Sequence, residues 1–358
     1  MIDNFHEIPP YSLKKKAKAE MLLRELKQMT EVHRIKCPPY AAFLDTVGYD
    51  ANEIISLADL PFLPVRIFKE LEIRSIPQEK VFKTMMSSGT NGQRQSKIFL
   101  DKDNAILQQK VLLRLLGDFI GPKRLPMLVV DTKSVISNRQ LFTTRGATII
   151  GLDFAARGMT FVLRDDMSLD VETLKEFVAK HGQEPFIIFG FTFMVWQHLF
   201  HEIDNKKLKV DLSKGYLLTA GGWKKLSSTA VSHENFKKTG RDVCGITQYV
   251  DHYGMAEQTG SIYAECECGH LHASIYSDVI VRRSRDFTAC DYLEPGLIQV
   301  LSVLPRSYPG HSLLTEDMGM ILGEDDCPCG RKGKYIKILG RVKQAELRGC
   351  SDTYAATF

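Results

Sequence analysis

Apolar residues recur at helical spacing near the start of the chain. One face of a first helix is expected to be formed by Leu22, Leu26, Met29 and Val32. Ser12 precedes this pattern and is a candidate N-cap. Pro38 and Pro39 are expected to end the helix, because proline disfavours helical geometry in the residue before it.

From residue 84 onward, short apolar runs alternate with helical patterns. Helices are predicted from Asp103 to about Leu116 and after Ser168, which is a candidate N-cap. Buried strands are predicted at 127–131, 185–190 and 215–220. Strands that alternate with helices favour a mostly parallel sheet that is covered on both faces.

After residue 260 the pattern changes to strands without long helices. Strands are predicted at 297–304, 312–315 and 335–339. The expected fold class is therefore α/β, with mostly parallel sheets covered by helices and a β-rich distal part. We expect one large domain over residues 1–339, followed by a short hinge and tail over residues 340–358.

Composition adds limits on the class of protein. The 358 residues are 44% hydrophobic and 25% charged, as in an ordinary globular protein, and the net charge of +4 does not indicate nucleic-acid binding. The first residues lack the charged-then-apolar layout expected of a signal peptide, and no apolar run approaches the ~20 residues of a membrane span. A cytoplasmic location is expected, where the eight cysteines would serve as thiols, metal ligands or catalysts instead of disulfides.

Residues 86–97 combine hydroxyls, glycines and cations. Glycines allow the backbone to form a nest of N–H donors, and serine and threonine add hydroxyl donors for phosphate oxygens. Arg94 and Lys97 add positive charge, although the segment does not match the Walker pattern. The candidate phosphate-binding residues are Ser87, Ser88, Gly89, Thr90, Asn91 and Gly92. A polar surface loop is the alternative explanation.

Four later segments follow this loop in order: 219–223, 253–258, 314–317 and 339–343. Together with the loop they resemble the adenylate-forming enzymes, a superfamily of acyl- and aryl-CoA ligases, luciferases and peptide-synthetase adenylation domains. Taken singly, Tyr253 could be a core aromatic, Glu257 a surface carboxylate and Asp317 a turn residue. The order of the segments along one chain is what carries the resemblance.

The resemblance implies ATP and Mg²⁺ as cofactors. It implies that Gly221 and Gly222 present backbone to the adenine and that Tyr253 stacks on the purine. Gly254 and Met255 belong to the same nucleotide-binding segment.

The resemblance also implies roles for four charged residues. Glu257 would hold Mg²⁺, Lys97 would act on the phosphates, Asp317 would bind the ribose hydroxyls, and Arg341 would contact the nucleotide near the hinge. A carboxylate that attacks the α-phosphorus brings negative charges together, so cations and oriented hydrogen-bond donors are needed to stabilise the transition state.

The tail suggests the acyl acceptor. Adenylate-forming enzymes usually continue past the hinge into a mobile lid with a lysine, whereas this sequence stops at Phe358, so we expect a truncated lid and assign no such lysine. Segments 219–224, 306–309 and 349–351 resemble the acyl-protein synthetases of bacterial luminescence fatty-acid reductase complexes. That family implies a fatty acid substrate, a reductase subunit as partner and acyl transfer to Cys350, whose thiol pKa Arg348 could lower.

Two close cysteine pairs bracket the β-rich region. The expected structural Zn²⁺ ligands are Cys266, Cys268, Cys327 and Cys329. His272 could replace Cys268, and thiols without metal are the alternative. Similar pairs occur in ligases related to phenylacetate-CoA ligase, which this chain also resembles. The cysteines expected to pack as small apolar residues are Cys37, Cys244 and Cys290.

Three functions remain open from the sequence. The first is an ATP-dependent acyl-protein synthetase that uses Cys350. The second is a phenylacetate-type acyl-CoA ligase, and the third is a catalytically idle, zinc-containing assembly subunit. Residues 190–196 follow a predicted strand and could accept an apolar acyl chain or ring, although core packing explains them equally well.

Overall fold

The computed structural model describes residues 5, 7–87, 95–137, 144–221 and 231–342. These residues form two compact units. The first unit contains described residues up to 87, from 95 to 118 and from 253 to 342, and the second contains those from 119 to 252. No helix in the described part of the chain combines the length and apolar character that a membrane crossing requires.

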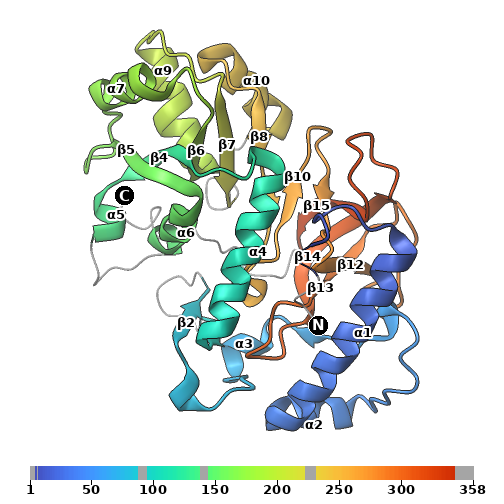
Figure 1. The fold of residues 1–358 in the computed structure, drawn as a ribbon. Helices are drawn as coiled ribbons and strands as arrows, with labels where there is room; N and C mark the ends of the chain where they lie inside the picture. The colour runs from blue at the N-terminus through green and yellow to red at the C-terminus, as the bar shows by residue number, and fades with distance from the viewer. Residues whose placement is uncertain (1–4, 6, 88–94, 138–143, 222–230, 343–358) are drawn as a thin grey trace. The chain divides into compact units, whose positions relative to one another are not determined.

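The second unit is built around a five-stranded parallel sheet (Figure 1). Its strand order is β5-β4-β6-β7-β8. The strands are β4 (Leu125–Thr132), β5 (Ala156–Leu163), β6 (Phe186–Phe191), β7 (Gly215–Ala220) and β8 (Gln248–Val250). All six residues of β6 are buried, as expected for a parallel strand covered on both faces.

Helices surround this sheet. They are α5 (Ser134–Ser137), α6 (Thr144–Leu152), α7 (Val171–His181), α8 (Thr192–Met194), α9 (His201–Asn205) and α10 (His233–Cys244), with a π-helix at Val195–Phe200 between α8 and α9 and a 3-10 turn at Asp153–Ala155. Helix α7 is capped by Asp170, whose side chain accepts a hydrogen bond from the Thr173 backbone N–H at 3.3 Å. The predicted cap Ser168 was therefore wrong. Its hydroxyl donates to Asp166 in the preceding turn instead.

The first unit contains a mainly antiparallel sheet of eight strands. Its main path is β12-β13-β14-β15-β11-β10-β9, and β1 pairs with β14 in parallel. The strands are β1 (Leu63–Pro64), β9 (His252–Tyr253), β10 (Tyr263–Glu265), β11 (Leu271–His272), β12 (Ser277–Arg282), β13 (Gly296–Ser302), β14 (Ser312–Glu324) and β15 (Lys334–Arg341). A separate antiparallel hairpin joins β2 (Lys83–Met86) to β3 (Lys97–Leu100).

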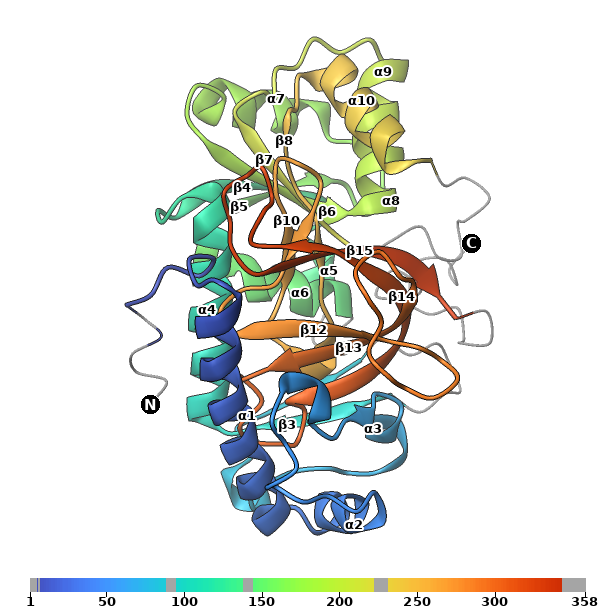
Figure 2. The same cartoon turned by 90° about the vertical axis from the view of Figure 1, so that its right-hand side faces the viewer.

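Helix α1 lies beside strands β12 and β13 in the two views of the first unit (Figures 1 and 2). The helices of this unit are α1 (Lys15–Lys36), α2 (Pro38–Thr46), α3 (Ile67–Glu70) and α4 (Lys102–Ile120), which begins here, with 3-10 turns at Leu57–Asp59, Gln78–Lys80 and Ala256–Gln258. Leu22, Leu26 and Met29 are buried, which agrees with the predicted apolar face of α1.

The predicted N-cap of the first helix was wrong, and the prolines have a second role. Helix α1 begins after Lys14, and the Ser12 hydroxyl donates to the Pro9 carbonyl at 2.9 Å. Pro38 and Pro39 follow the end of α1 and also begin α2, because the first helical turn needs no backbone N–H donor there.

The predicted fold class is confirmed by the parallel sheet of one unit and the strand-rich character of the other. Strand β14 continues to Glu324, well beyond the predicted end at Thr315. Polar residues after Thr315 end the apolar run, but the backbone of β14 still pairs with β13 and β15 on its two sides. The strands that were not predicted are β1, β2, β3, β5, β8, β9, β10, β11 and β12.

Candidate nucleotide site and metal centre

The hairpin of β2 and β3 forms the base of the predicted phosphate loop. The Ser87 N–H donates to the Ser96 carbonyl at 3.1 Å, and the Ser96 N–H donates to the Ser87 hydroxyl at 2.9 Å. Ser87 is therefore held at the base of the loop. The other predicted phosphate-binding residues lie outside the described residues: Ser88, Gly89, Thr90, Asn91 and Gly92.

Lys97 is the cation nearest this base along the strand. It is paired with Met86 across the hairpin, and its side chain is half exposed. Its Nζ lies 3.4 Å from the Glu72 carboxylate, which is 57% exposed. Exposed ion pairs of this kind contribute little to stability, so the ammonium can exchange this partner for a phosphate at small cost.

Tyr253 at the end of β9 and Arg341 at the end of β15 come together with Asp317 in the middle of β14. The Tyr253 hydroxyl donates to Asp317 Oδ2 at 2.7 Å, and Arg341 Nε lies 3.4 Å from Asp317 Oδ1. Residues 317 and 341 are directly opposite each other in the pairing of β14 with β15. Burial, followed by the negative charge of Asp317, raises the pKa of Tyr253 well above its usual value. The tyrosine therefore acts as a neutral hydrogen-bond donor.

The Thr315 side chain holds the backbone around Asp317 in place. The Thr315 hydroxyl accepts from the Asp317 N–H at 3.1 Å and donates to the Ile298 carbonyl at 2.8 Å. Thr315 is buried, whereas the Asp317 side chain is 16% exposed. This leaves a partly accessible carboxylate on a rigid strand, which is suited to binding hydroxyl donors.

Glu257 lies in the 3-10 turn Ala256–Gln258 and is buried. Burial raises the pKa of its carboxyl group, while Ser96 and the positive charges of Lys69 and Arg341 act in the opposite direction. A buried carboxylate is costly without a cation, so binding a divalent ion would remove this penalty. The two other predicted residues of this segment are less buried than Glu257. Gly254 is exposed, and Met255 packs partly against the core of the unit.

The β2–β3 hairpin and the turn at Glu257 lie next to each other. Ser96 is close enough to Glu257 to influence its pKa, and the Thr259 hydroxyl lies 3.5 Å from the Met85 sulfur. The base of the phosphate loop and the candidate Mg²⁺ ligand are therefore neighbours within one unit. Sequence reasoning did not single out Ser96, because its spacing in the chain gave no indication of this contact.

Gly221 lies at the end of β7 in the second unit. Its φ is +68°, a conformation that favours glycine, and a Cβ atom there would lie 3.2 Å from the Phe191 ring. Its carbonyl accepts a hydrogen bond from the Thr192 hydroxyl at 2.7 Å. The carboxyl end of a parallel strand is a common ligand-binding position. Gly222 and Cys350 lie outside the described residues.

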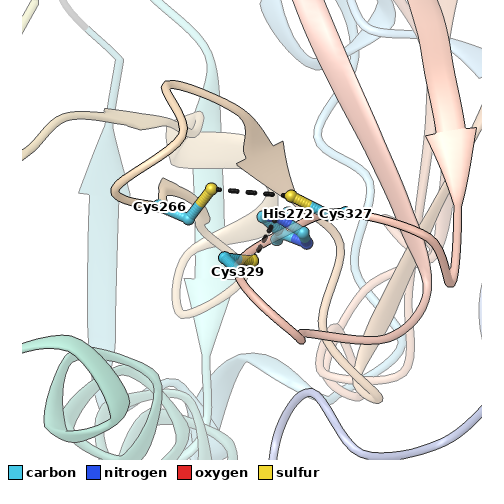
Figure 3. A group of neighbouring side chains, drawn as sticks. All are labelled: Cys266, His272, Cys327 and Cys329. Atoms are coloured by element: carbon cyan, nitrogen blue, oxygen red, sulfur yellow. Dashed lines mark hydrogen bonds between the residues drawn. The ribbon is translucent and has the colours of Figure 1, made fainter.

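A group of four side chains in the first unit could hold a metal ion (Figure 3). Their ligand atoms all lie within 4.8 Å of one another, and the residues are Cys266, His272, Cys327 and Cys329. The Cys266 and Cys327 sulfurs are 3.9 Å apart, and the Cys329 sulfur is 3.4 Å from His272 Nε2. Tetrahedral zinc with usual bond lengths requires about 3.8 Å between sulfurs and about 3.5 Å between sulfur and nitrogen.

Two similar turns present the cysteines. In each turn, the N–H of a glycine donates to the carbonyl of the cysteine three residues before it: Gly269 to Cys266 at 2.8 Å and Gly330 to Cys327 at 3.0 Å. Both glycines have positive φ values, +77° and +85°. The first turn joins β10 to β11, and the second joins β14 to β15.

The structure places His272 in the group and leaves Cys268 outside it. Cys268 is exposed, whereas His272 lies in β11, is fully buried and pairs with Tyr335 of β15. Burial lowers the pKa of His272 to about 4, so its imidazole is neutral, as a metal ligand must be. Of the four predicted ligands, the structure brings three together.

Comparisons with known proteins give matches over nearly the whole chain. A family model described as "Acyl-protein synthetase, LuxE" matches residues 3–358. A "long-chain-fatty-acid–luciferin-component ligase" of Vibrio harveyi is 21% identical over 368 residues, which cover 94% of this chain and 90% of the relative.

Solved structures show the same fold. A 2-hydroxyisobutyryl-CoA ligase in complex with 2-HIB-AMP and CoA has a TM-score of 0.72 at 16% identity, over 94% of this chain and 70% of that one. ATP-bound MatB from Rhodopseudomonas palustris has a TM-score of 0.50 at 15% identity, over 75% of this chain and 49% of that one. At these identities the likeness concerns the fold alone.

Proposed function

The chain belongs to the LuxE family of acyl-protein synthetases, and on this premise we propose that it activates a fatty acid with ATP and then binds the acyl group as a thioester on Cys350. The chain is an ATP-dependent ligase with the adenylate-forming fold. The substrate class rests on the name of the Vibrio harveyi relative, which acts on long-chain fatty acids.

The observation that carries the proposal is the cluster of Tyr253, Asp317 and Arg341 beside β14 and β15. An aromatic ring, a partly exposed carboxylate and a guanidinium match the three parts of AMP: the purine, the ribose hydroxyls and the phosphate. Arginine and carboxylate groups are suited to such hydrogen bonds because the charge strengthens them.

In the first half-reaction, an oxygen of the fatty acid carboxylate attacks the α-phosphorus of ATP. A new oxygen–phosphorus bond forms, the bond to the β-phosphate oxygen breaks, and pyrophosphate leaves. The Ser87 loop and Lys97 would bind the phosphates, and Glu257 would hold Mg²⁺, which offsets their charge. Gly221 would present backbone to the adenine.

In the second half-reaction, the Cys350 thiolate attacks the acyl carbon, a carbon–sulfur bond forms and AMP leaves with the electron pair of the broken carbon–oxygen bond. A thiolate is a strong nucleophile, and one on the same chain makes the step intramolecular. A reductase that accepts the acyl group from this thioester is the partner that the chemistry favours.

Zn²⁺ is proposed at the group of Cys266, His272, Cys327 and Cys329. Four protein ligands leave no open coordination position, so the ion would be structural. It would tie the β10–β11 turn and β11 to the turn between β14 and β15.

Intact and peptide mass spectra after incubation with ATP, Mg²⁺ and a series of fatty acids test the thioester. We expect an acyl adduct on Cys350 that hydroxylamine removes and that Cys350→Ser abolishes. Cys268→Ser is the matched control, because Cys268 is an exposed thiol outside the metal group, and it should leave the adduct unchanged. A different result would contradict the proposal: pyrophosphate is released, no adduct forms on Cys350, and acyl-CoA appears once CoA is added. That result would favour an acyl-CoA ligase.

A further inference from the structure

The turn that carries Glu257 is held by a second segment, residues 304–311, which joins β13 to β14 and is called the support loop here. The Tyr308 hydroxyl donates to the Glu257 backbone carbonyl at 2.9 Å, and the Tyr308 side chain is fully buried. A buried tyrosine hydroxyl requires a hydrogen-bond partner. This bond joins the support loop directly to the peptide group of Glu257.

Gln258 makes a second connection between the same two segments. Its Nε2 donates to the Gly310 carbonyl at 2.8 Å and to the Val300 carbonyl at 3.2 Å. A Cβ atom on Gly310 would lie 2.9 Å from the Glu257 carbonyl oxygen and 2.3 Å from the Tyr308 ring. The turn and the loop therefore pack without space for an additional methyl group.

The support loop is itself fixed on its other side. Asn104 of α4 accepts hydrogen bonds from the backbone N–H groups of Arg306 at 2.9 Å and Ser307 at 3.0 Å, and donates to the Leu304 carbonyl at 2.6 Å. The Ser75 N–H donates to the Ser307 carbonyl at 2.7 Å. These contacts give Tyr308 a rigid base from which to orient Glu257.

From these contacts we infer that Tyr308 is a positioning residue for Mg²⁺ binding, acting through the backbone of Glu257. The inference rests on the proposed role of Glu257 as the Mg²⁺ ligand. A buried carboxylate can bind the ion well only if its direction is fixed, and the hydroxyl of Tyr308 fixes the peptide group next to it. Tyr308 touches neither the ion nor the nucleotide in this scheme.

The test is the Mg²⁺ dependence of ATP binding, measured by titration calorimetry on the full chain at a series of Mg²⁺ concentrations. Tyr308→Phe removes only the hydroxyl, so we expect the half-saturating Mg²⁺ concentration to rise about five- to tenfold, a change of about 1 to 1.4 kcal/mol. Tyr249→Phe is the matched control. It removes a hydroxyl that also donates to a backbone carbonyl, that of Lys237 at 2.8 Å, in the other unit.

Three results separate this inference from the proposed function. If Glu257→Gln raises the Mg²⁺ requirement and Tyr308→Phe does not, the positioning role is wrong and the role of Glu257 stands. If Glu257→Gln also leaves the Mg²⁺ requirement unchanged, both are wrong. Should Tyr308→Phe not fold, Gly310→Ala places a methyl group against the Tyr308 ring and the Glu257 carbonyl oxygen and so disturbs the same bond, and an unchanged Mg²⁺ requirement in that folded variant overturns the inference.

Discussion

The Asp317 carboxylate is shared between a neutral donor, the Tyr253 hydroxyl, and a cation, the Arg341 guanidinium. Its side chain remains 16% exposed, so it can also accept hydrogen bonds from a ligand. Charged hydrogen bonds contribute about 1.5–3 kcal/mol, which corresponds to roughly 10- to 100-fold in affinity.

Asp317→Asn is therefore expected to weaken ATP binding about 10- to 100-fold while the fold is retained. Calorimetric titration with ATP and Mg²⁺ measures the effect. Glu316→Gln provides the control, since it neutralises the adjacent carboxylate, and it should bind ATP like the unaltered protein. Equal affinity in both variants would show that Asp317 does not bind the nucleotide.

At the residue scale, the motif residues could be predicted from the sequence, but the residues that hold them in place could not. Tyr253 and Asp317 could be named because they belong to recognisable segments, and the structure brings them into contact. The contact of Tyr308 with Glu257 spans 51 positions along the chain, so no local pattern indicated it. For the metal group, the cysteine spacing suggested Cys268, but the position of His272 on a strand next to β15 directs it into the group.

Helix α4 connects its own first turn to the support loop. At the start of the helix, the Asn104 backbone N–H donates to the Asp101 carboxylate at 2.8 Å. The Asn104 side chain makes three further hydrogen bonds, all to residues 304–307. Asn104 as a whole is 3% exposed. Its removal would leave two backbone N–H groups and one carbonyl of the loop without this partner.

We expect Asn104→Ala to lower the free energy of unfolding by about 2–4 kcal/mol, since each buried polar group left unpaired costs about 1–3 kcal/mol. Denaturant unfolding followed by circular dichroism measures this change. Asn52→Ala is the control, because the Asn52 side chain is bonded at an exposed site to Asp50, two residues away, and it should change stability by less than about 0.5 kcal/mol. If Asn104→Ala also lowered the free energy of unfolding by less than about 0.5 kcal/mol, Asn104 would not stabilise the support loop as described.

At the element scale, periodicity predicted the long helices and the fully apolar strands. Helix α4 and strands β4, β6 and β7 were found where apolar runs predicted them. Strand β2 has a mixed burial pattern with no fully buried position, so it lacks the alternation that identifies a strand. It forms because its backbone pairs with β3 across the loop, which is a contact that hydrophobic pattern does not encode.

At the scale of the whole molecule, the first unit is built from separate stretches of the described chain. The first unit collects three stretches, and its eight-stranded sheet is assembled from residues as distant as Leu63 and Leu313, which are paired in β1 and β14. The predicted boundary at residues 339 and 340 remains a prediction, because the tail beyond residue 342 lies outside the described residues. The family resemblance, in contrast, is confirmed by the match over residues 3–358.

The metal group lies within this first unit and joins its sheet to the β14–β15 turn. Because a metal that binds only the folded state stabilises that state, we expect about one Zn²⁺ per chain and a loss of about 5 °C or more in melting temperature after chelation. Elemental analysis and calorimetry measure the two quantities. The Asp317 carboxylate and Arg341 are outside the group, so they should not be needed for zinc retention.

The choice of ligands gives this prediction a sharp test. Cys329→Ser and His272→Ala each remove a member of the group, whereas Cys268→Ser removes an exposed thiol outside it. The first two variants should lose zinc and melt at a lower temperature, and the third should keep both properties. If Cys268→Ser lost zinc as completely as Cys329→Ser, the four-cysteine set would be the correct one. Full retention in His272→Ala would likewise exclude the imidazole, because a tetrahedral site cannot lose one of four ligands without weaker binding.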